Sequence, residues 1–311
     1  MQKIIPVLFV TLFAAVLPAD IIMKLDMPRT CYMIYEPVTA NLALRNTSGQ
    51  TLVFGNEPEF KGHMEVELSD MHGRPLPGSG TRIDLKGLIL RPGINHRIRI
   101  NLSKWLNLNR TNFYKLRLFI AHPMLKNEYQ SNQAMFDVAQ GKVLWSRNFG
   151  VPQLEGSPSM GKDLPMRTYT LKTLQDKSDV HIFLLVEDKE KIYALKNLGR
   201  LLGRETPSCE IDALNQLHIL LPVTPKIFHY QVFDWKGNRE VERVYRTAQR
   251  VPILFRDVNN GSVRVIGGEN AQLGVDYVPE KLLPGVPLVN PAAEKQPAEK
   301  PAEKPAKKAQ K

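Results

Sequence analysis

The sequence has few of the residues that build disulfide frameworks, metal sites and nucleophilic active sites. Its 311 residues include 2 cysteines and 7 histidines, and no Cys-x-x-Cys pair, His-Glu-x-x-His motif or nucleophile elbow occurs. No apolar run beyond the first 17 residues is long enough to cross a bilayer. These absences exclude a cysteine-rich scaffold and a multi-span membrane protein. They also predict a chain without catalytic residues, cofactor or metal ion.

Long helices are disfavoured as well, because 23 prolines are spread along the chain. Hydrophobic residues make up 43% of the sequence, which is ample for ordinary cores, and the length suffices for two domains. The net charge is +11. An excess of cations attracts a protein to anionic polymers such as surface glycans, although it can also serve only to keep the protein soluble.

The first residues have the order of a secretory signal. Lys3 is followed by an apolar run from Ile4 to Leu17, and Pro18-Ala19 precede Asp20. We therefore expect residues 1–19 to be a signal peptide, with an uncleaved N-terminal anchor as the alternative. The mature protein is then exported, to a periplasm, a cell surface or the medium.

The two cysteines, Cys31 and Cys209, lie far apart in the sequence. Because an exported pair meets oxidising conditions, they could form a disulfide, the alternative being two buried free thiols. Sequence spacing does not decide between the two.

The C-terminal segment repeats Pro-Ala-Glu-Lys units. Proline, charge and low hydrophobicity prevent a packed core, so residues 281–311 are predicted to be a disordered tail.

Alternating strands follow the leader. Residues 38–44 carry apolar side chains at every second position, a turn follows at residues 46–50, and the alternation resumes at Leu52. Similar patterns recur near residues 64–68, 94–102, 114–120 and 134–138. About seven short strands separated by turns are typical of an immunoglobulin-like (Ig-like) antiparallel β-sandwich, predicted here over residues 20–147.

These strands carry a resemblance. The motifs Tyr-x-Glu-Pro-Val, Leu-x-Leu-x-Asn-x-Ser, Leu-x-Pro-Gly and Tyr-x-Leu-x-Leu resemble the strand grammar of bacterial Ig-like domains, a group that includes the Bacillus-type intracellular proteinase inhibitor. The resemblance covers residues 28–140 and implies the fold. It transfers no functional residue, and where such domains often have glycine before the tyrosine this chain has Asn112-Phe113.

A segment rich in Gly, Pro and Ser, residues 148–166, is predicted to link the sandwich to a second β-domain at residues 167–280. A Pro-x4-Asp-x2-Asn motif at residues 207–215 recurs 45 residues later, at 252–260. Val180–Leu185 also resembles Leu217–Leu221, which gives His181 and His218 matching positions. The period is that of one propeller blade, but about two and a half units are too few for a closed propeller. Residues 188–202 fit either a helix or a strand.

Candidate chemistry in the second half is weak. Residues 156–162 have P-loop spacing and contain a Ser-x-x-Lys match, yet Asp163 follows and the companion motifs are absent, so we interpret them as part of the linker. Asp257–Gly261 is interpreted as a hairpin turn rather than a calcium loop. His181 and His218 are interpreted as structural. Whether His218, His229 and Asp234 converge stays open.

One candidate surface remains on the sandwich. Its members alternate with inward-facing residues and would form a basic patch if their strands shared a sheet: Arg45, Arg97, Arg99, Lys115 and Arg117.

The function that these patterns favour is binding or scaffolding, without catalysis, in a bacterial envelope. The partner would be an anionic polymer, a glycan or another protein. The alternatives are a proteinase inhibitor, which rests on the resemblance, and a hydrolase with an unrecognised site in the second half. The sequence identifies neither a specific ligand nor the oligomeric state.

Overall fold

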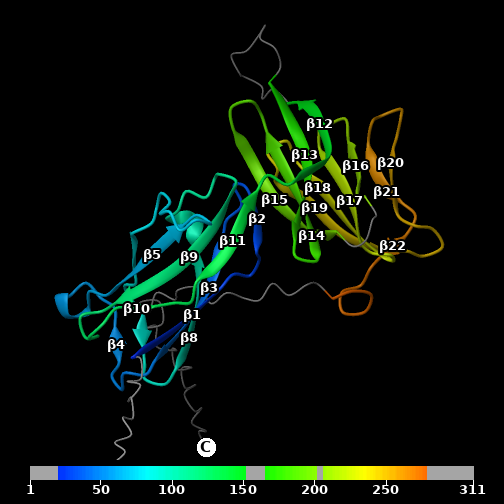
Figure 1. Ribbon diagram of the computed structural model, residues 1–311. Helices are drawn as coiled ribbons and strands as arrows, with labels where there is room; N and C mark the ends of the chain where they lie inside the picture. Colours follow the sequence, from blue (N-terminus) through cyan, green and yellow to red (C-terminus); the bar gives the residue numbers. More distant parts are fainter. Residues whose placement is uncertain (1–19, 152–164, 202–205, 279–311) are drawn as a thin grey trace, which may run out of the picture.

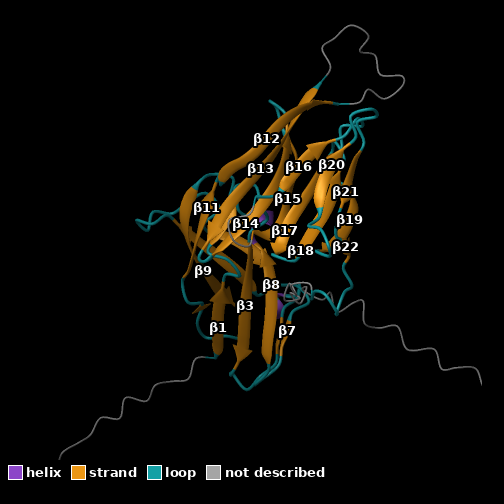
Figure 2. Ribbon diagram, turned by 90° about the vertical axis from the view of Figure 1, so that its right-hand side faces the viewer, coloured by secondary structure: helices purple, strands orange, loops and turns teal. Residues whose placement is uncertain are grey.

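The computed structural model describes residues 20–151, 165–201 and 206–278, which form two β-sheet parts side by side (Figure 1). We call residues 20–139 the sandwich and the described residues from 142 to 278 the sheet stack. Apart from two single-turn 3-10 helices, η1 (Pro58–Phe60) and η2 (Leu102–Lys104), every regular element in these ranges is a strand (Figure 2). The all-β prediction is confirmed. The predicted signal peptide and the predicted tail lie outside the described residues.

Two sheets face each other in the sandwich. The first has the strand order β1 (Ile21–Asp26), β3 (Thr39–Asn46), β8 (Asn95–Asn101). The second has the order β2 (Cys31–Met33), β11 (Ala134–Ala139), β9 (Asn112–Ala121), β5 (His63–Ser69), β6 (Thr81–Asp84), with β10 (Tyr129–Gln130) paired to β9. A separate short pair consists of β4 (Leu52–Val53) and β7 (Ile89–Leu90).

The sandwich strands alternate between core and solvent, as their sequence predicts. Leu42 and Leu44 of β3 are each 1% exposed, whereas Arg45 next to them is exposed. Leu116 and Leu118 of β9 meet them in the same core from the opposing sheet. Because side chains on a strand point to opposite faces in turn, this core fixes which residues face outward on both sheets.

Two features give the sandwich its Ig-like character. The first part of the chain changes sheets, since β1 pairs with β3 whereas β2 runs parallel to β11 in the other sheet. In addition, the Tyr114 hydroxyl near the start of β9 donates to the carbonyl oxygen of Arg110 at 2.9 Å. A tyrosine that bonds to backbone a few residues upstream is the tyrosine corner of Ig-like folds. Tyr114 opens the Tyr-x-Leu-x-Leu motif that carried the resemblance.

The passage from sandwich to sheet stack is much shorter than predicted. Only Gln140 and Gly141 lie between β11 and β12 (Lys142–Gly150). Strand β12 pairs with β13 (Met166–Asp176) with Gly150 opposite Met166, so residues 148–166 connect neighbouring strands of one sheet. The prediction of an interdomain linker there was wrong, because Gly, Pro and Ser are equally typical of hairpin loops. The residues with P-loop spacing lie outside the described residues.

The sheet stack consists of three antiparallel sheets. The first has the order β12, β13, β14 (Asp179–Glu187), β15 (Ile192–Leu201). The second has the order β16 (Ser208–Ile211), β17 (Leu217–Thr224), β18 (Ile227–Phe233), β19 (Arg239–Arg246), β22 (Glu269–Asn270). The third is the hairpin of β20 (Ile253–Arg256) and β21 (Val263–Ile266). Strand β15 settles the open assignment of residues 188–202.

The three sheets are layered face to face. Leu184 of the first sheet and Ile219 of the second belong to one core, and Tyr230 of the second packs with Leu254 of the third in another. The outer face of the third sheet exposes Ile253 and Phe255, at 52% and 39%. The second half is therefore an open series of blade-like sheets, which matches the predicted two and a half units.

The 45-residue repeat corresponds to an edge hairpin of successive sheets. Asp212 in the β16–β17 turn and Asp257 in the β20–β21 turn each accept backbone N–H bonds inside their own turn. The matching of His181 with His218 was wrong, however. His181 lies on the third strand of its sheet, whereas His218 lies on the second strand of its own. The two apolar runs are similar in sequence, but their strands do not hold equivalent positions.

Candidate functional site

The two cysteines do not bridge. Cys31 and Cys209 are both free thiols: Cys31 packs at the junction of the two parts, and Cys209 packs in the core between the first two sheets of the stack. Burial raises the pKa of both thiols, that of Cys209 to about 12, which leaves them protonated and unreactive. The possible disulfide is not formed, because the strands that carry these residues belong to different layers.

His218 and His229, two histidines of the second half, lie in different surroundings. His218 is 5% exposed, with Nδ1 2.7 Å from the Tyr230 hydroxyl and Nε2 3.1 Å from Asp212 Oδ2. His229 lies opposite Leu221 on β17, whereas His218 lies opposite Val232, three residues further along β18. Asp234 accepts N–H bonds within its own turn, so the three residues do not converge. His218 is thus enclosed between two hydrogen-bond partners, and its interpretation as a structural residue stays a prediction. Among the residues that the structure describes, no group of three His, Cys, Asp or Glu side chains is placed to hold a metal ion.

The Asp257 turn also keeps its structural interpretation. Asp257 Oδ1 and Asn260 Oδ1 accept N–H bonds from Asn259 and Ser262 at 2.9 and 2.8 Å. Oxygens used in this way shape the hairpin between β20 and β21.

The predicted basic patch is divided between two faces. Arg45, Arg97 and Arg99 lie on β3 and β8, whereas Lys115 and Arg117 lie on β9 of the opposing sheet. Since each sheet turns its apolar side chains to the shared core, the two sets point away from each other. The prediction of a single five-residue patch was therefore wrong.

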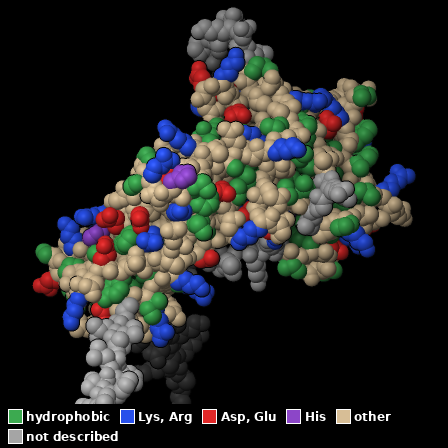
Figure 3. Space-filling view, viewed as in Figure 1, with side chains coloured by type: hydrophobic (Ala, Val, Ile, Leu, Met, Phe, Trp, Pro, Cys, Tyr) green, Lys and Arg blue, Asp and Glu red, His purple; other side chains and the backbone are tan. Residues whose placement is uncertain are grey.

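Both cations of the opposing set have partners. Arg117 lies 3.6 Å from the carboxylate of Glu67, and Lys115 donates to the carbonyl oxygen of Met71 at 2.7 Å. On the face that Figure 3 shows, the sandwich carries Lys and Arg side chains interspersed with Asp and Glu side chains.

A stronger grouping forms on the outer face of the β1-β3-β8 sheet. Lys24 lies beside Ala43, which in turn lies beside Arg97, so the small alanine leaves the two cations on one open row. The exposed Arg45 and Arg99 occupy the adjoining rows. We call Lys24, Arg45, Arg97 and Arg99 the basic face. Lys24 was missed in the sequence because its strand directly follows the predicted leader, although its alternation with buried Ile21, Met23 and Leu25 was a usable signal.

The charges of the basic face are largely free. Within the described ranges, Lys24, Arg45 and Arg97 form no ion pair or side-chain hydrogen bond, and Arg99 contacts only the Thr39 hydroxyl, at 3.4 Å. An exposed carboxylate on this face, Asp26, lies two residues from Lys24 and shares a row with Arg99, but it forms no ion pair with either among the described residues. Such a flat, unpaired cationic surface suits carboxylate or phosphate groups.

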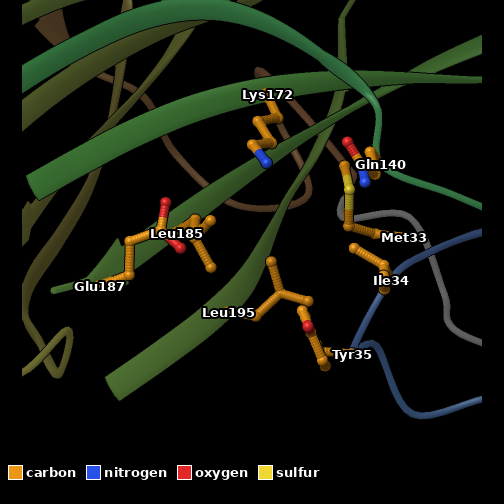
Figure 4. A pocket seen from close by; sticks show the side chains of 8 residues that line it. All are labelled: Met33, Ile34, Tyr35, Gln140, Lys172, Leu185, Glu187 and Leu195. Atoms are coloured by element: carbon orange, nitrogen blue, oxygen red, sulfur yellow. The ribbon is translucent and has the colours of Figure 1, made fainter. Parts of the chain in front are cut away.

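A second candidate site is a cleft between the two parts. It has a volume of about 200 Å³ and is lined by residues of both (Figure 4): Met33, Ile34, Tyr35 and Gln140 from the sandwich side and Lys172, Leu185, Glu187 and Leu195 from the stack. Clefts at such junctions are common ligand sites.

One wall of the cleft is a braced turn. Met33–Glu36 is a β-turn in which the Glu36 N–H donates to Met33 O at 2.9 Å, and Tyr35 has a φ of 70°. A bulky residue at positive φ is strained. Glu36 Oε2 accepts from Met33 N at 2.9 Å and from the Arg29 guanidinium, and these bonds hold the turn. Burial raises the pKa of Glu36, while Arg29 opposes that rise.

The floor of the junction is tied by one carboxylate. Asp176 Oδ1 accepts from Thr30 N at 2.9 Å, from Thr30 Oγ1 at 2.5 Å and from Cys31 N at 3.1 Å. The Arg29 guanidinium also lies 4.6 Å from the Tyr32 ring and 5.8 Å from the Phe183 ring. Both walls of the cleft are therefore fixed relative to each other.

A third cluster, at the opposite end of the stack, has a structural explanation. Arg167 lies 3.3 Å from the Tyr193 ring and 4.9 Å from the Trp235 ring, and it donates to the carbonyl oxygen of Trp235 at 2.7 Å. Tyr193 donates to Asp188, a bond that helps to lower the pKa of this carboxyl to about 2. This cluster joins the first two sheets at their turns.

Comparison with known proteins gives no family. No family model and no curated protein matches the chain. Seven solved chains match it. One is the sporulation control protein Spo0M from Bacillus subtilis, 9% identical, covering 58% of this chain and 91% of that one at a TM-score of 0.26. Another is the YadV chaperone, 12% identical, covering 73% and 99% at a TM-score of 0.20. At these scores neither likeness supports an argument about function.

No helix in the described ranges is both long and apolar enough to cross a membrane.

Proposed function

We propose that this chain is an exported, non-enzymatic binding or scaffolding protein of the bacterial envelope, and that it contacts an anionic polymer through the basic face. The observation that carries the proposal is the grouping of four cations on one sheet face, three of them without a partner among the described residues. The proteinase-inhibitor and hydrolase alternatives have no comparable support in the geometry.

The rigidity of this sheet favours repeated contacts. Arg97 and Arg99 are about 7 Å apart along β8, and Lys24 lies two strands, or about 10 Å, from Arg97. A flexible polymer with regularly spaced carboxylates or phosphates can meet several of them together. Each exposed contact is worth about 0.5 kcal/mol, so three contacts change affinity by roughly tenfold.

The test is retention of the mature protein on insoluble envelope polymer across a salt series. We expect the Arg45→Gln, Arg97→Gln, Arg99→Gln triple variant to lose about tenfold in retention at low salt. The matched control replaces three cations of the opposing sheet, Arg82→Gln, Lys115→Gln and Arg117→Gln, and should lose less than about twofold.

A third arm removes residues 292–311, which hold six lysines and three glutamates. If only this truncation reduces retention, the basic face is not the contact. Equal retention of all variants, or retention that ignores salt, would refute an electrostatic contact altogether.

A further inference from the structure

Two oppositely charged side chains, neither of them in an ion pair among the described residues, line the cleft between the sandwich and the stack. Lys172 on β13 and Glu187 on β14 both line it, and neither forms an ion pair with any residue in the described ranges. Lys172 lies opposite Phe183 of β14, and Phe183 is four residues before Glu187 on that strand. The Cα atoms of Lys172 and Glu187 are therefore about 13 Å apart along the strand direction.

Between these charges the cleft is apolar. Leu185 is 5% exposed and pairs with Leu195 on the neighbouring strand, while Met33 and Ile34 face them from the sandwich side (Figure 4). Lys172 and Glu187 stand at opposite sides of Leu185 in this view. The cleft thus presents a cation at one end, an apolar floor in the middle and an anion at the other end.

The opposite wall of the cleft contains a residue with a strained backbone. Tyr35 keeps its strained backbone at the edge of the cleft because Glu36 and Arg29 brace the turn. Strained residues that the surrounding structure holds in place cluster at ligand-binding sites. The strain and the unpaired charges are independent observations, and they meet in one cavity.

The volume of the cleft limits the size of the ligand that it can bind. A volume of about 200 Å³ lies below the usual range for drug-sized ligands, roughly 300–1,000 Å³, so the cleft can enclose only part of a short peptide, such as one apolar side chain. The termini of an extended tripeptide are about 10 Å apart, which the two side chains can span by leaning inward.

We infer that the cleft binds a short peptide with free termini and an apolar side chain. Its α-amino group would meet Glu187, its α-carboxylate would meet Lys172, and its apolar side chain would pack on Leu185 and Leu195. This inference does not depend on the proposed polymer contact, which uses the far sheet of the sandwich.

Isothermal titration with trileucine, N-acetyl-trileucine and trileucine amide tests the assignment of each terminus. We expect the full chain to bind trileucine about tenfold more tightly than either blocked form. Glu187→Gln should abolish the preference for a free amine and keep the preference for a free carboxylate. Lys172→Met should do the reverse, and the exposed Lys196→Met should change neither.

This crossed pattern separates recognition from general damage to the fold, which would weaken all three peptides alike. The inference is overturned if free and blocked peptides bind equally, if both variants lose affinity without a change in preference, or if trileucine gives no binding at about 5 mM. A polymer contact that survives these results would leave the proposed function intact.

Discussion

The sandwich and the sheet stack bury their apolar residues in different patterns. In most strands of the sandwich one face is buried, as in β1, where buried and exposed residues alternate without exception. In the stack, β17 has six consecutive buried residues, and β14 has five. The reason is the position of these strands in the stack. Strand β14 packs against the sandwich on one face and against the second sheet on the other. Strand β17 packs against the first sheet on one face and against the third sheet on the other.

This difference shows that the pattern of apolar residues along a strand depends on how many faces of its sheet are covered. It does not depend on whether the sheet is parallel or antiparallel. A sheet covered on both faces has continuous apolar strands, even when it is antiparallel. The third sheet of the stack returns to one buried face, with Leu254 inward and Ile253 outward. A layered series therefore ends where alternation returns.

The largest expected effect contrasts a central and a terminal layer. Ile219→Ala removes a side chain with 0% exposure and should lower the free energy of unfolding by about 3 kcal/mol. Ile253→Ala, at 52% exposure, should change it by less than about 0.5 kcal/mol. Urea unfolding followed by circular dichroism measures both, and similar losses would mean that the outer face of the third sheet is covered in solution.

A somewhat smaller effect is expected at the junction. Asp176→Ala leaves the Thr30 and Cys31 N–H groups without their acceptor and should cost about 2 kcal/mol. It should also separate the unfolding of the sandwich from that of the stack in calorimetry. Asp179→Ala is the control, since this carboxylate is 44% exposed and pairs at the surface with Arg200. A single unchanged transition in Asp176→Ala would show that other contacts couple the two parts.

The smallest effect concerns pH. Burial, aided by Arg29, lowers the pKa of His181 below its ordinary value of 6.5. The unfolded chain then binds this proton more readily than the folded chain, so stability is unaffected above about pH 6.5 and falls as the pH drops from there toward the folded pKa. His181→Gln should flatten this part of the stability curve, measured by urea unfolding from pH 7.5 to 5.

His229 contributes in the same direction, because burial is also the main reason for its lowered pKa. The double variant should therefore be flatter than His181→Gln alone. His72→Gln, in an exposed turn of the sandwich, serves as the control. An acid-side slope that is identical in wild type and double variant would assign the loss to other groups.

Local pattern was enough to predict the sandwich strands, the Tyr114 motif and the edge hairpin repeat. Each of these depends on residues that are close in sequence. The basic patch failed because it required knowing that β9 pairs with β5 while β3 pairs with β8. Such pairings depend on contacts between distant residues, and alternation on one strand carries no information about its partner.

The junction could not be predicted for a related reason. Neither Asp176, at the end of a strand, nor Thr30, in a loop before β2, has a sequence signature for the bond between them. The cleft residues come from both parts, so none of them stood out as a site.

The two-residue passage through Gly141 has a mechanical consequence. Gly141 has a φ of 67°, and a Cβ placed there would lie 2.6 Å from Met33 Cε and 2.8 Å from Thr173 O. A larger residue at this position would clash with the Thr173 carbonyl oxygen and displace the end of the Met33 side chain, so the chain crosses between the two parts where there is little room. A pulling force on one part is therefore transmitted to the other without a flexible tether to absorb it.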